Sequence, residues 1–291
     1  SIDLGDGVRM RLVRVPAGEF LMGSEFGLPD ERPITRVRIE EPFWMGRFEV
    51  TNEQYACFDG RHDSGVESRF SMQFGVRGFY VNNPQQPVVR VSWKETMAFC
   101  RWLSEKTGET FDLPTEAQWE YACRAGAAAP FFYGGLDADF SPFANLADAK
   151  LSEFVCHTYK KEREPWTQAS KYDDWIPKDA RFNDGGFLSA DVGNYLPNAW
   201  GLHDMHGNVW EWTRSDFKPY PYSDGDGRND LSESEKKVAR GGSWRDRPAQ
   251  CRSAFRLAYR PYQRVYNVGF RVVCRATRAG ADVARAGRIE E

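Results

Sequence analysis

Residues 201–213, GLHDMHGNVWEWT, combine two Gly, two His, one Asp, one Asn, one Glu and two Trp. This composition is too polar for a core strand and too rich in tryptophan for a surface loop. Gly207 and Asn208 break a helix and favour unusual backbone angles, whereas residues 209–213 alternate with the period of a strand. A loop that runs into a strand and presents the carboxylates of Asp204 and Glu211 predicts a site for a hard cation.

The composition is that of a chain with enough apolar material for a sizeable core. The 291 residues are 41% hydrophobic and 14% aromatic, with 10 Trp, and fit one large domain or two small ones. The formal net charge of −3 creates no global field that would favour nucleic acid or acidic lipid. No run of about 18 apolar residues is present, so we expect no membrane span.

The two ends of the sequence suggest a piece of a longer chain. The sequence begins at Ser1 without Met, so we expect a processed or truncated product whose targeting signal has been removed. Residues 276–291 consist mainly of Ala, Arg, Gly and Glu and predict a flexible tail or linker. The domain is therefore expected to span residues 1–275.

Alternating segments predict a β-rich N-terminal third. Residues 8–15 alternate, residues 16–19 form a turn and residues 20–22 return, which predicts a hairpin with a longer loop. Further strands are expected at 35–39, 43–50, 207–213, 237–242, 252–257 and 268–274.

Three capping boxes predict three helices. In each, a Ser or Thr side chain caps the helix and a Glu or Gln three residues later reaches back. The pairs are Thr51 with Gln54, Ser92 with Glu95 and Thr115 with Gln118, and the helices are expected to end near Phe58, Ser104 and Arg124. Along the second helix one face carries apolar residues that we interpret as core: Trp93, Met97, Cys100 and Leu103.

Residues 127–200 show little regular pattern. So long an irregular stretch inside a compact domain is usually functional or held by ligands such as metal ions.

Seven words of this sequence, in this order, resemble the formylglycine-generating enzyme (sulfatase-modifying factor) family from about Val8 to Cys274. They are VPAGEFLMGS at 15–24, FEVTNEQY at 48–55, PVVRVSW at 87–93, LPTEAQWEYACRAG at 113–126, GLHDMHGNVWEWT at 201–213, RGGSW at 240–244 and NVGFRVV at 267–273. The resemblance implies an α+β, irregular single domain of C-type-lectin-like type with little regular secondary structure, stabilised by one or two structural calcium ions.

The resemblance also implies the calcium ligands. In the second site they fall on the side chains of Asp204 and Glu211 and the carbonyls of Gly207 and Val209. In the first site they fall on the Asn145 and Asp184 side chains and the Leu146 and Gly186 carbonyls, with a one-residue shift to Phe187 as an alternative to Gly186.

The family's copper centre is incomplete in this chain. The enzymes hold copper(I) between two cysteines and convert a cysteine of a Cys-x-Pro-x-Arg substrate into formylglycine. Here the second cysteine is Cys251, but Asp246 takes the place of the first. A carboxylate is a hard ligand, whereas copper(I) prefers two thiolates. We therefore expect copper-dependent formylglycine generation to be lost.

Other positions of the family's pocket are retained or basic. Ser243, Trp210 and Asn267 stand where the enzymes place pocket residues, and Ser243 joins Asp246 and Cys251 as a candidate catalytic group. Arg247 and Arg252 make this neighbourhood basic, and guanidinium groups would lower the pKa of the Cys251 thiol. A reactive thiol is therefore one hypothesis for Cys251, but a buried, inert thiol is the commoner outcome for such a residue.

The remaining arginines, histidines and cysteines allow further hypotheses. Arg256, Arg260 and Arg264 belong either to the same basic surface or to a solvated face. Separately, His203 and His206 flank Asp204 at a spacing that could hold iron or zinc.

The six cysteines form no CxxC pair, so a structural zinc site is not expected. The resemblance suggests disulfide positions at Cys100 and Cys123, and a Cys100–Cys274 bridge is conceivable because Cys274 shares a strand face with Val272, the position of the usual partner.

Together these observations favour a formylglycine-generating-enzyme-like, calcium-binding domain. It is expected to bind a peptide, protein or small-molecule ligand in the former catalytic cleft. For its localisation, export to the periplasm or the extracellular space is favoured over the cytoplasm. The alternative is an oxygen-dependent oxidoreductase of the same family with altered chemistry on a thiol, peptide or small molecule. A third reading keeps the parent reaction with a metal site of another kind.

Overall fold

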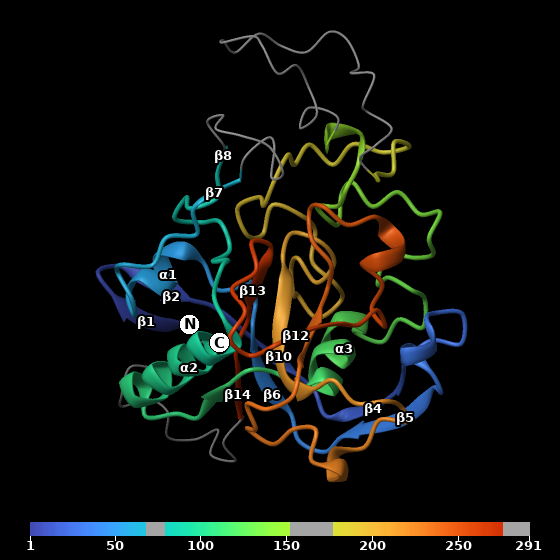
Figure 1. The fold of residues 1–291 in the computed structure, drawn as a ribbon, viewed down its shortest axis with the longest axis horizontal. Helices are drawn as coiled ribbons and strands as arrows, with labels where there is room; N and C mark the ends of the chain where they lie inside the picture. The colour runs from blue at the N-terminus through green and yellow to red at the C-terminus, as the bar shows by residue number, and fades with distance from the viewer. Residues whose placement is uncertain (68–78, 152–176, 276–291) are drawn as a thin grey trace, which may run out of the picture.

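The computed structural model describes residues 1–67, 79–151 and 177–275, so the predicted tail at 276–291 lies outside the described residues. Short helices and strands alternate along the chain and are joined by long irregular segments (Figure 1). The α+β class and the low content of regular structure are therefore confirmed.

All three predicted helices are confirmed with their capping boxes. In each, the cap side chain accepts from the backbone N–H three residues later, and the Glu or Gln at that position bonds back to the cap. The helices are α1 (Asn52–Ala56), α2 (Trp93–Thr107) and α3 (Glu116–Arg124). Four residues on one face of α2 are buried in the largest core cluster, as expected from their spacing: Trp93, Met97, Cys100 and Leu103.

The central sheet has four strands in the order β12-β11-β10-β13. Its longest strand is β10 (Trp210–Asp216), which pairs antiparallel with β11 (Lys237–Arg240) and parallel with β13 (Val268–Phe270). The edge strand β12 (Leu257–Tyr259) pairs with β11. Figure 1 shows β10 at the centre of the molecule, between α2 and α3. The strand period predicted after Asn208 is thus confirmed, although β10 begins at Trp210.

A second four-stranded sheet has the order β3-β6-β14-β9. It contains β3 (Leu12–Val15), β6 (Phe43–Gly46), β14 (Val273–Arg275) and β9 (Phe111–Asp112). The segment predicted as one strand at 268–274 is in fact two strands, because β13 joins the central sheet and β14 joins this one. The chain therefore links the two sheets at residues 271–272.

Three two-stranded sheets complete the fold. They are β1 (Ile2–Gly5) with β2 (Val8–Met10), β4 (Gly18–Met22) with β5 (Thr35–Ile39), and β7 (Val66–Glu67) with β8 (Phe79–Tyr80). The predicted hairpin across residues 16–19 is wrong, because β3 pairs with β6 whereas β4 pairs with β5. The strand predicted at 252–257 is also wrong, since regular pairing begins only at Leu257.

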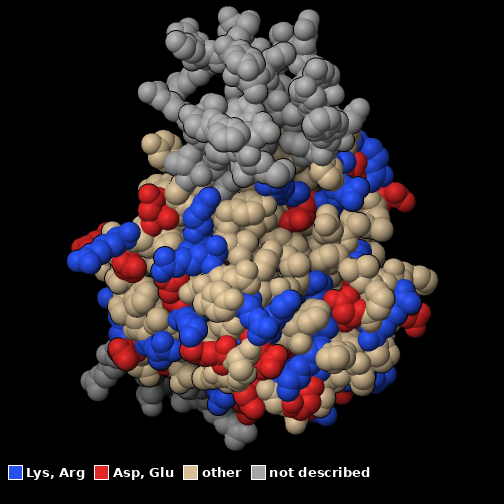
Figure 2. All heavy atoms as spheres, in the orientation of Figure 1, with Lys and Arg blue, Asp and Glu red and all other residues tan. Residues whose placement is uncertain are grey.

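The rest of the described chain is irregular. Four 3₁₀ turns interrupt it at Pro29–Glu31, Ala149–Leu151, Asp224–Asp226 and Pro248–Gln250. Within residues 127–151 and 177–200 there is no regular strand, in agreement with the sequence pattern. Figure 2 shows basic and acidic side chains interspersed over the visible face, as the near-balanced charge suggests. None of the described helices has the length and apolar character needed to cross a membrane.

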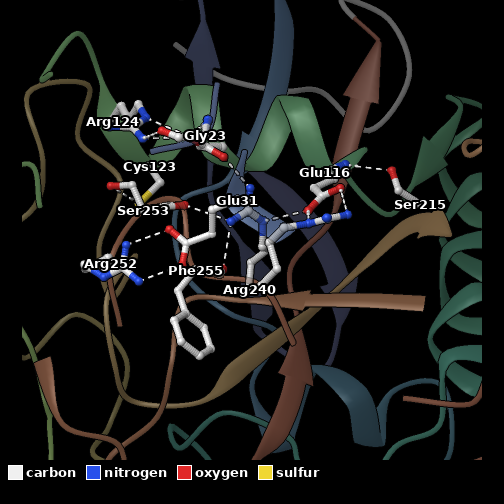
Figure 3. Close-up of polar contacts among 12 residues, drawn as sticks. Gly23, Glu31, Glu116, Cys123, Arg124, Ser215, Arg240, Arg252, Ser253 and Phe255 are labelled. Atoms are coloured by element: carbon white, nitrogen blue, oxygen red, sulfur yellow. Dashed lines mark hydrogen bonds and ion pairs between the residues drawn. The ribbon is translucent and has the colours of Figure 1, made fainter. Parts of the chain in front are cut away.

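A buried network of charges attaches α3 to the central sheet. Arg240 of β11 is fully buried, forms an ion pair with Glu120 and lies 3.4 Å from the carboxylate of Glu116. Arg124 pairs with Glu120 at 2.8 Å, and Arg256 pairs with Glu116 at 2.6 Å. Figure 3 draws these contacts around Arg240, with Glu116 and Arg124 contributed by α3. The network fixes α3 beside the loop that precedes β10.

Candidate functional site

The loop before β10 is held from inside by Asn208. The backbone of Asn208 is left-handed, with φ 53°. The side-chain NH₂ of Asn208 donates to the carboxylate of Glu49 at 3.0 Å, and its side-chain oxygen accepts from the backbone N–H of Ala190 at 2.8 Å. Gly207 precedes it at φ 79°, and a Cβ there would lie 2.1 Å from the Asn145 carbonyl oxygen. Only glycine fits this close approach.

Four buried ionisable side chains meet beneath this loop. Glu49, Asp204, Glu211 and Arg271 are all at most 2% exposed. Arg271 donates to both carboxylate oxygens of Glu211, at 2.6 and 2.7 Å, and the Trp119 indole donates to one of them at 2.7 Å. Arg271 is therefore committed to Glu211, while the hydrogen bonds that Glu49 and Asp204 accept from the described residues come from neutral donors.

This cluster carries an excess of buried negative charge, with three carboxylates against one guanidinium. Burial, reinforced by Asp204 and Glu211, raises the pKa of Glu49 well above its usual value. Burial also raises the pKa of Asp204 to about 6, although the hydrogen bond from the Gly193 N–H acts to lower it. The Oδ1 atom of Asp204 is buried and finds no donor among the described residues. Both an oxygen ligand and a negative charge are thus available to a cation.

The predicted ligands of the second calcium site fit this cluster. Asp204, Gly207 and Val209 lie in the buried loop before β10 and Glu211 is the second residue of that strand, while the Val209 N–H donates to Glu49 at 3.3 Å. A bound ion would share the Glu211 oxygens with Arg271, which a carboxylate with two lone pairs per oxygen allows. Among the described residues no group of three His, Cys, Asp or Glu side chains is arranged as a ready metal cage. The predicted set does not need one, because two of its four ligands are carbonyls.

Residues predicted as ligands of the first calcium site lie close to one another. Asn145 Oδ1 is buried without a donor among the described residues, and a Cβ on Gly186 would lie 2.8 Å from it. The Leu146 N–H donates to the Asp184 carboxylate at 2.8 Å. Burial and the neighbouring carboxylate of Asp148 raise the pKa of Asp184 to about 7. Asp148, which the sequence reading did not include, adds a second buried carboxylate to this site.

Asp246, which the resemblance aligns with the first copper cysteine of the enzymes, is the centre of a hydrogen-bonded cluster. Its Oδ2 atom accepts from the Trp210 indole at 2.8 Å and from the Ser243 hydroxyl. The Asn267 amide donates to the same hydroxyl at 2.8 Å. Four of the predicted pocket and catalytic residues, from three separate segments, therefore lie together. Burial raises the pKa of Asp246, although Ser243 and Trp210 act in the opposite direction.

Cys251 lies beside this cluster but is closed off from it. The residue is fully buried, and its thiol donates to the backbone carbonyl of Asp246 at 3.6 Å. A Cβ on Gly242 would lie 2.1 Å from its sulfur. Burial, followed by the charge of Asp246, raises the pKa of the thiol well above its usual value. The expected lowering by nearby guanidinium groups is therefore wrong, because desolvation outweighs it.

The arginines around the cleft are largely committed to other partners. Arg252 pairs with Glu31 at 2.6 Å, Arg256 is buried against Glu116, and Arg264 donates to Glu95. Arg247 is exposed at the start of a 3₁₀ turn. Arg260, also exposed, donates to the Ser234 carbonyl at 2.9 Å. Arg260 and Arg264 thus agree with the solvated face offered as an alternative, and none of the described side-chain contacts joins Arg247 to the Asp246 cluster.

The two histidines that flank Asp204 do not converge. His203 contacts the Tyr195 carbonyl at 2.8 Å and Arg47 at 3.2 Å. His206 contacts the Cys251 carbonyl at 2.8 Å and stacks on Phe132, and burial lowers its pKa to about 4. The hypothesis of an iron or zinc site between these two histidines is therefore wrong.

The hypothetical disulfide is not formed. Cys100 and Cys274 are both buried in the largest core cluster and are free thiols. Burial raises the pKa of both. Cys156 lies outside the described residues.

Comparison with known proteins supplies the family context for this geometry. The family model of the sulfatase-modifying factor enzyme 1-like domain matches residues 8–276. A formylglycine-generating enzyme of Streptomyces coelicolor is 28% identical over a match that covers 89% of this chain and 87% of the relative. A protein of Bos taurus named inactive C-alpha-formylglycine-generating enzyme 2 is 26% identical, over 95% of this chain and 92% of its own.

A solved structure shares the fold over nearly the whole chain. PvdO from Pseudomonas aeruginosa superimposes with a TM-score of 0.69 at 28% sequence identity, covering 91% of this chain and 94% of its own. The irregular architecture around β10 is therefore common to both proteins.

Proposed function

The chain belongs to the family of sulfatase-modifying factor enzyme 1-like domains, the formylglycine-generating enzyme family, and from this we propose a ligand-binding role without copper chemistry. In this proposal the domain is stabilised by calcium, has lost copper-dependent formylglycine generation, and binds a peptide, protein or small molecule in the former catalytic cleft.

The observation that carries the proposal is the state of the two copper positions. Asp246 presents a hard carboxylate, which already accepts hydrogen bonds from Trp210 and Ser243. Cys251 is a fully buried thiol with a raised pKa and cannot supply the two exposed thiolates that copper(I) requires. These residues do not fit copper. The bovine relative whose name describes it as inactive supports the view that this fold persists without the activity.

Calcium in this proposal has a structural role. The donorless oxygens of Asp204 and Asn145 and the uncompensated carboxylates of Glu49 and Asp148 support two cation sites. Calcium has no redox chemistry and binds oxygen ligands in flexible geometry, so it would fix the irregular loops around β10 rather than react.

The proposal predicts no formylglycine on a Cys-x-Pro-x-Arg peptide incubated aerobically with the calcium-loaded protein and added copper. The measurement is the mass of the peptide, with the Streptomyces coelicolor enzyme as a positive control. The Asp246→Cys variant restores a second sulfur, so we expect it to bind copper(I) more tightly than the unsubstituted protein. Conversion of the peptide by the unsubstituted protein would overturn the proposal.

The oxidoreductase alternative needs a reactive group in the cleft. The burial and raised pKa of Cys251 weigh against a thiolate that reacts with oxygen. The same incubation tests this alternative, because an altered oxidation would change the mass of the peptide by a different amount.

A further inference from the structure

The hydrogen bonds around Asp246 have a fixed direction. As a carboxylate Asp246 can only accept, so the Ser243 hydroxyl must donate to it, and the Trp210 indole donates to the same oxygen. The Asn267 amide must then present its NH₂ group to Ser243, which it does at 2.8 Å. This order fixes the orientation of the Asn267 amide and turns its oxygen away from Ser243.

Two acceptor atoms remain without a donor. Asn267 is 5% exposed, and its Oδ1 atom finds no donor among the described residues. The second carboxylate oxygen of Asp246, Oδ1, receives no hydrogen bond from the described part of the chain, and Asp246 is only partly buried. For a buried acceptor such as the Asn267 oxygen, the lack of a donor costs about 1–3 kcal/mol. The cluster therefore favours a ligand that donates hydrogen bonds over one that accepts them.

The surroundings of Asp246 suit a cation. The Phe255 ring lies 5.8 Å from the Trp210 ring, and both Phe255 and Tyr259 are partly exposed. Burial and the charge of Asp246 raise the pKa of Tyr259 to about 12, which indicates that this ring lies within the field of the carboxylate. Aromatic faces attract cations, and do so more strongly where water is excluded.

One cationic side chain of the protein already acts on this carboxylate. Arg245 opposes the rise in the pKa of Asp246, but burial still outweighs it. The Arg245 guanidinium lies 5.7 Å from the Tyr266 ring centroid and donates to its hydroxyl at 3.3 Å. Arg245 therefore reduces the negative charge of the cleft without supplying the missing donors to Asp246 and Asn267.

We propose that the cleft binds a protonated primary amine, held by the Asp246 carboxylate and the Asn267 side-chain carbonyl. An ammonium group brings three donors and one positive charge, which matches two acceptors, one of them ionised. A lysine side chain or a small alkylamine has this chemistry. The inference rests on the proposed function, because it names the ligand class of the same cleft.

The test is a titration of the calcium-loaded, ¹⁵N-labelled protein with n-butylammonium, followed through the Trp210 indole N–H signal. This N–H donates to Asp246 and therefore reports on the site directly. We expect a saturable shift with n-butylammonium and none with n-butanol or butyrate at equal ionic strength. Asp246→Asn should weaken binding roughly tenfold or more, the loss expected for a hydrogen bond to a charged group. The control Asp6→Asn, at an exposed position, should bind as the unsubstituted protein does.

A second titration identifies the source of the amine, and three outcomes would contradict the proposal. An acetylated and amidated Gly-Lys-Gly peptide that binds more tightly than n-butylammonium would indicate a lysine of a protein partner, and the reverse a small amine. Absence of a shift in the folded protein, binding of butyrate in its place, or undiminished binding by Asp246→Asn would overturn the amine assignment. These results concern amine binding alone. The loss of copper chemistry is tested separately by the mass of the Cys-x-Pro-x-Arg peptide, so the two proposals can fail independently.

Discussion

Replacing Arg240 by methionine is expected to lower the free energy of unfolding by about 3–5 kcal/mol, the usual cost of removing one partner of a buried ion pair. Arg240 is fully buried, pairs with Glu120 and donates to the carbonyls of Ser253 and Phe255 at 3.0 and 2.8 Å. Burial alone would raise the pKa of Glu120, yet Arg124 and Arg240 hold it below its usual value. Without Arg240, that buried charge loses much of its compensation.

The measurement is urea unfolding at neutral pH in excess calcium. The matched control is Arg36→Met, since Arg36 is 76% exposed on its side chain and its 3.4 Å pair with Glu19 should contribute at most about 1 kcal/mol. If Arg240→Met does not yield folded protein, Arg240→Lys keeps the charge and should fold with a smaller loss. A loss below about 1 kcal/mol for Arg240→Met would show that the network is not a main support of α3.

Removing calcium with a strong chelator is expected to lower the thermal midpoint. An ion present at about 100 times its dissociation constant stabilises the folded state by about 2.7 kcal/mol. For a domain of this size that corresponds to roughly 5–10 °C per site. The physical reason is the buried excess of carboxylates around Asp204, which repel one another when the cation leaves. An unchanged midpoint would contradict calcium stabilisation.

Glu49→Gln tests whether this carboxylate belongs to the cation site. If it does, neutralising Glu49 removes repulsion in the calcium-free protein and attraction in the calcium-loaded one, so the chelator-induced drop in midpoint should shrink. A purely structural Glu49 would lower both midpoints equally and leave the difference unchanged. Glu25→Gln, at an exposed position, is the control and should preserve the full drop.

Local parts of the fold were predictable, whereas the pairing of strands was not. The three helices follow from capping boxes that lie within four residues of sequence, such as Ser92 with Glu95. The false hairpin at 16–19 arose because adjacent alternating segments look like partners, while β3 and β4 find their partners β6 and β5 further along the chain. The 252–257 segment carries buried side chains in an irregular loop, which no alternation rule identifies.

The sequence predicts several residues of the site, but not the balance of charge in the buried cluster. The family words bring Asp204, Gly207 and Glu211 together in a loop that runs into a strand, and the structure has Asp204 and Gly207 in a loop and Glu211 in β10. They gave no sign that Glu49 and Arg271, from two distant segments, complete the charge of that cluster. Glu49 lies in the FEVTNEQY word, in the irregular segment between β6 and α1, where no local pattern marks it as buried. The burial of Cys251 likewise depends on packing against Gly242, which only the structure reveals.

Metal analysis of the purified protein, after exposure to copper(I) under reducing conditions and desalting into metal-free buffer, tests the central claim most directly. The Asp204 and Asn145 sites predict about one to two calcium ions per chain, and Asp246 in place of a thiolate predicts no retained copper. Stoichiometric copper or iron, or a folded protein that holds no calcium at all, would contradict the account.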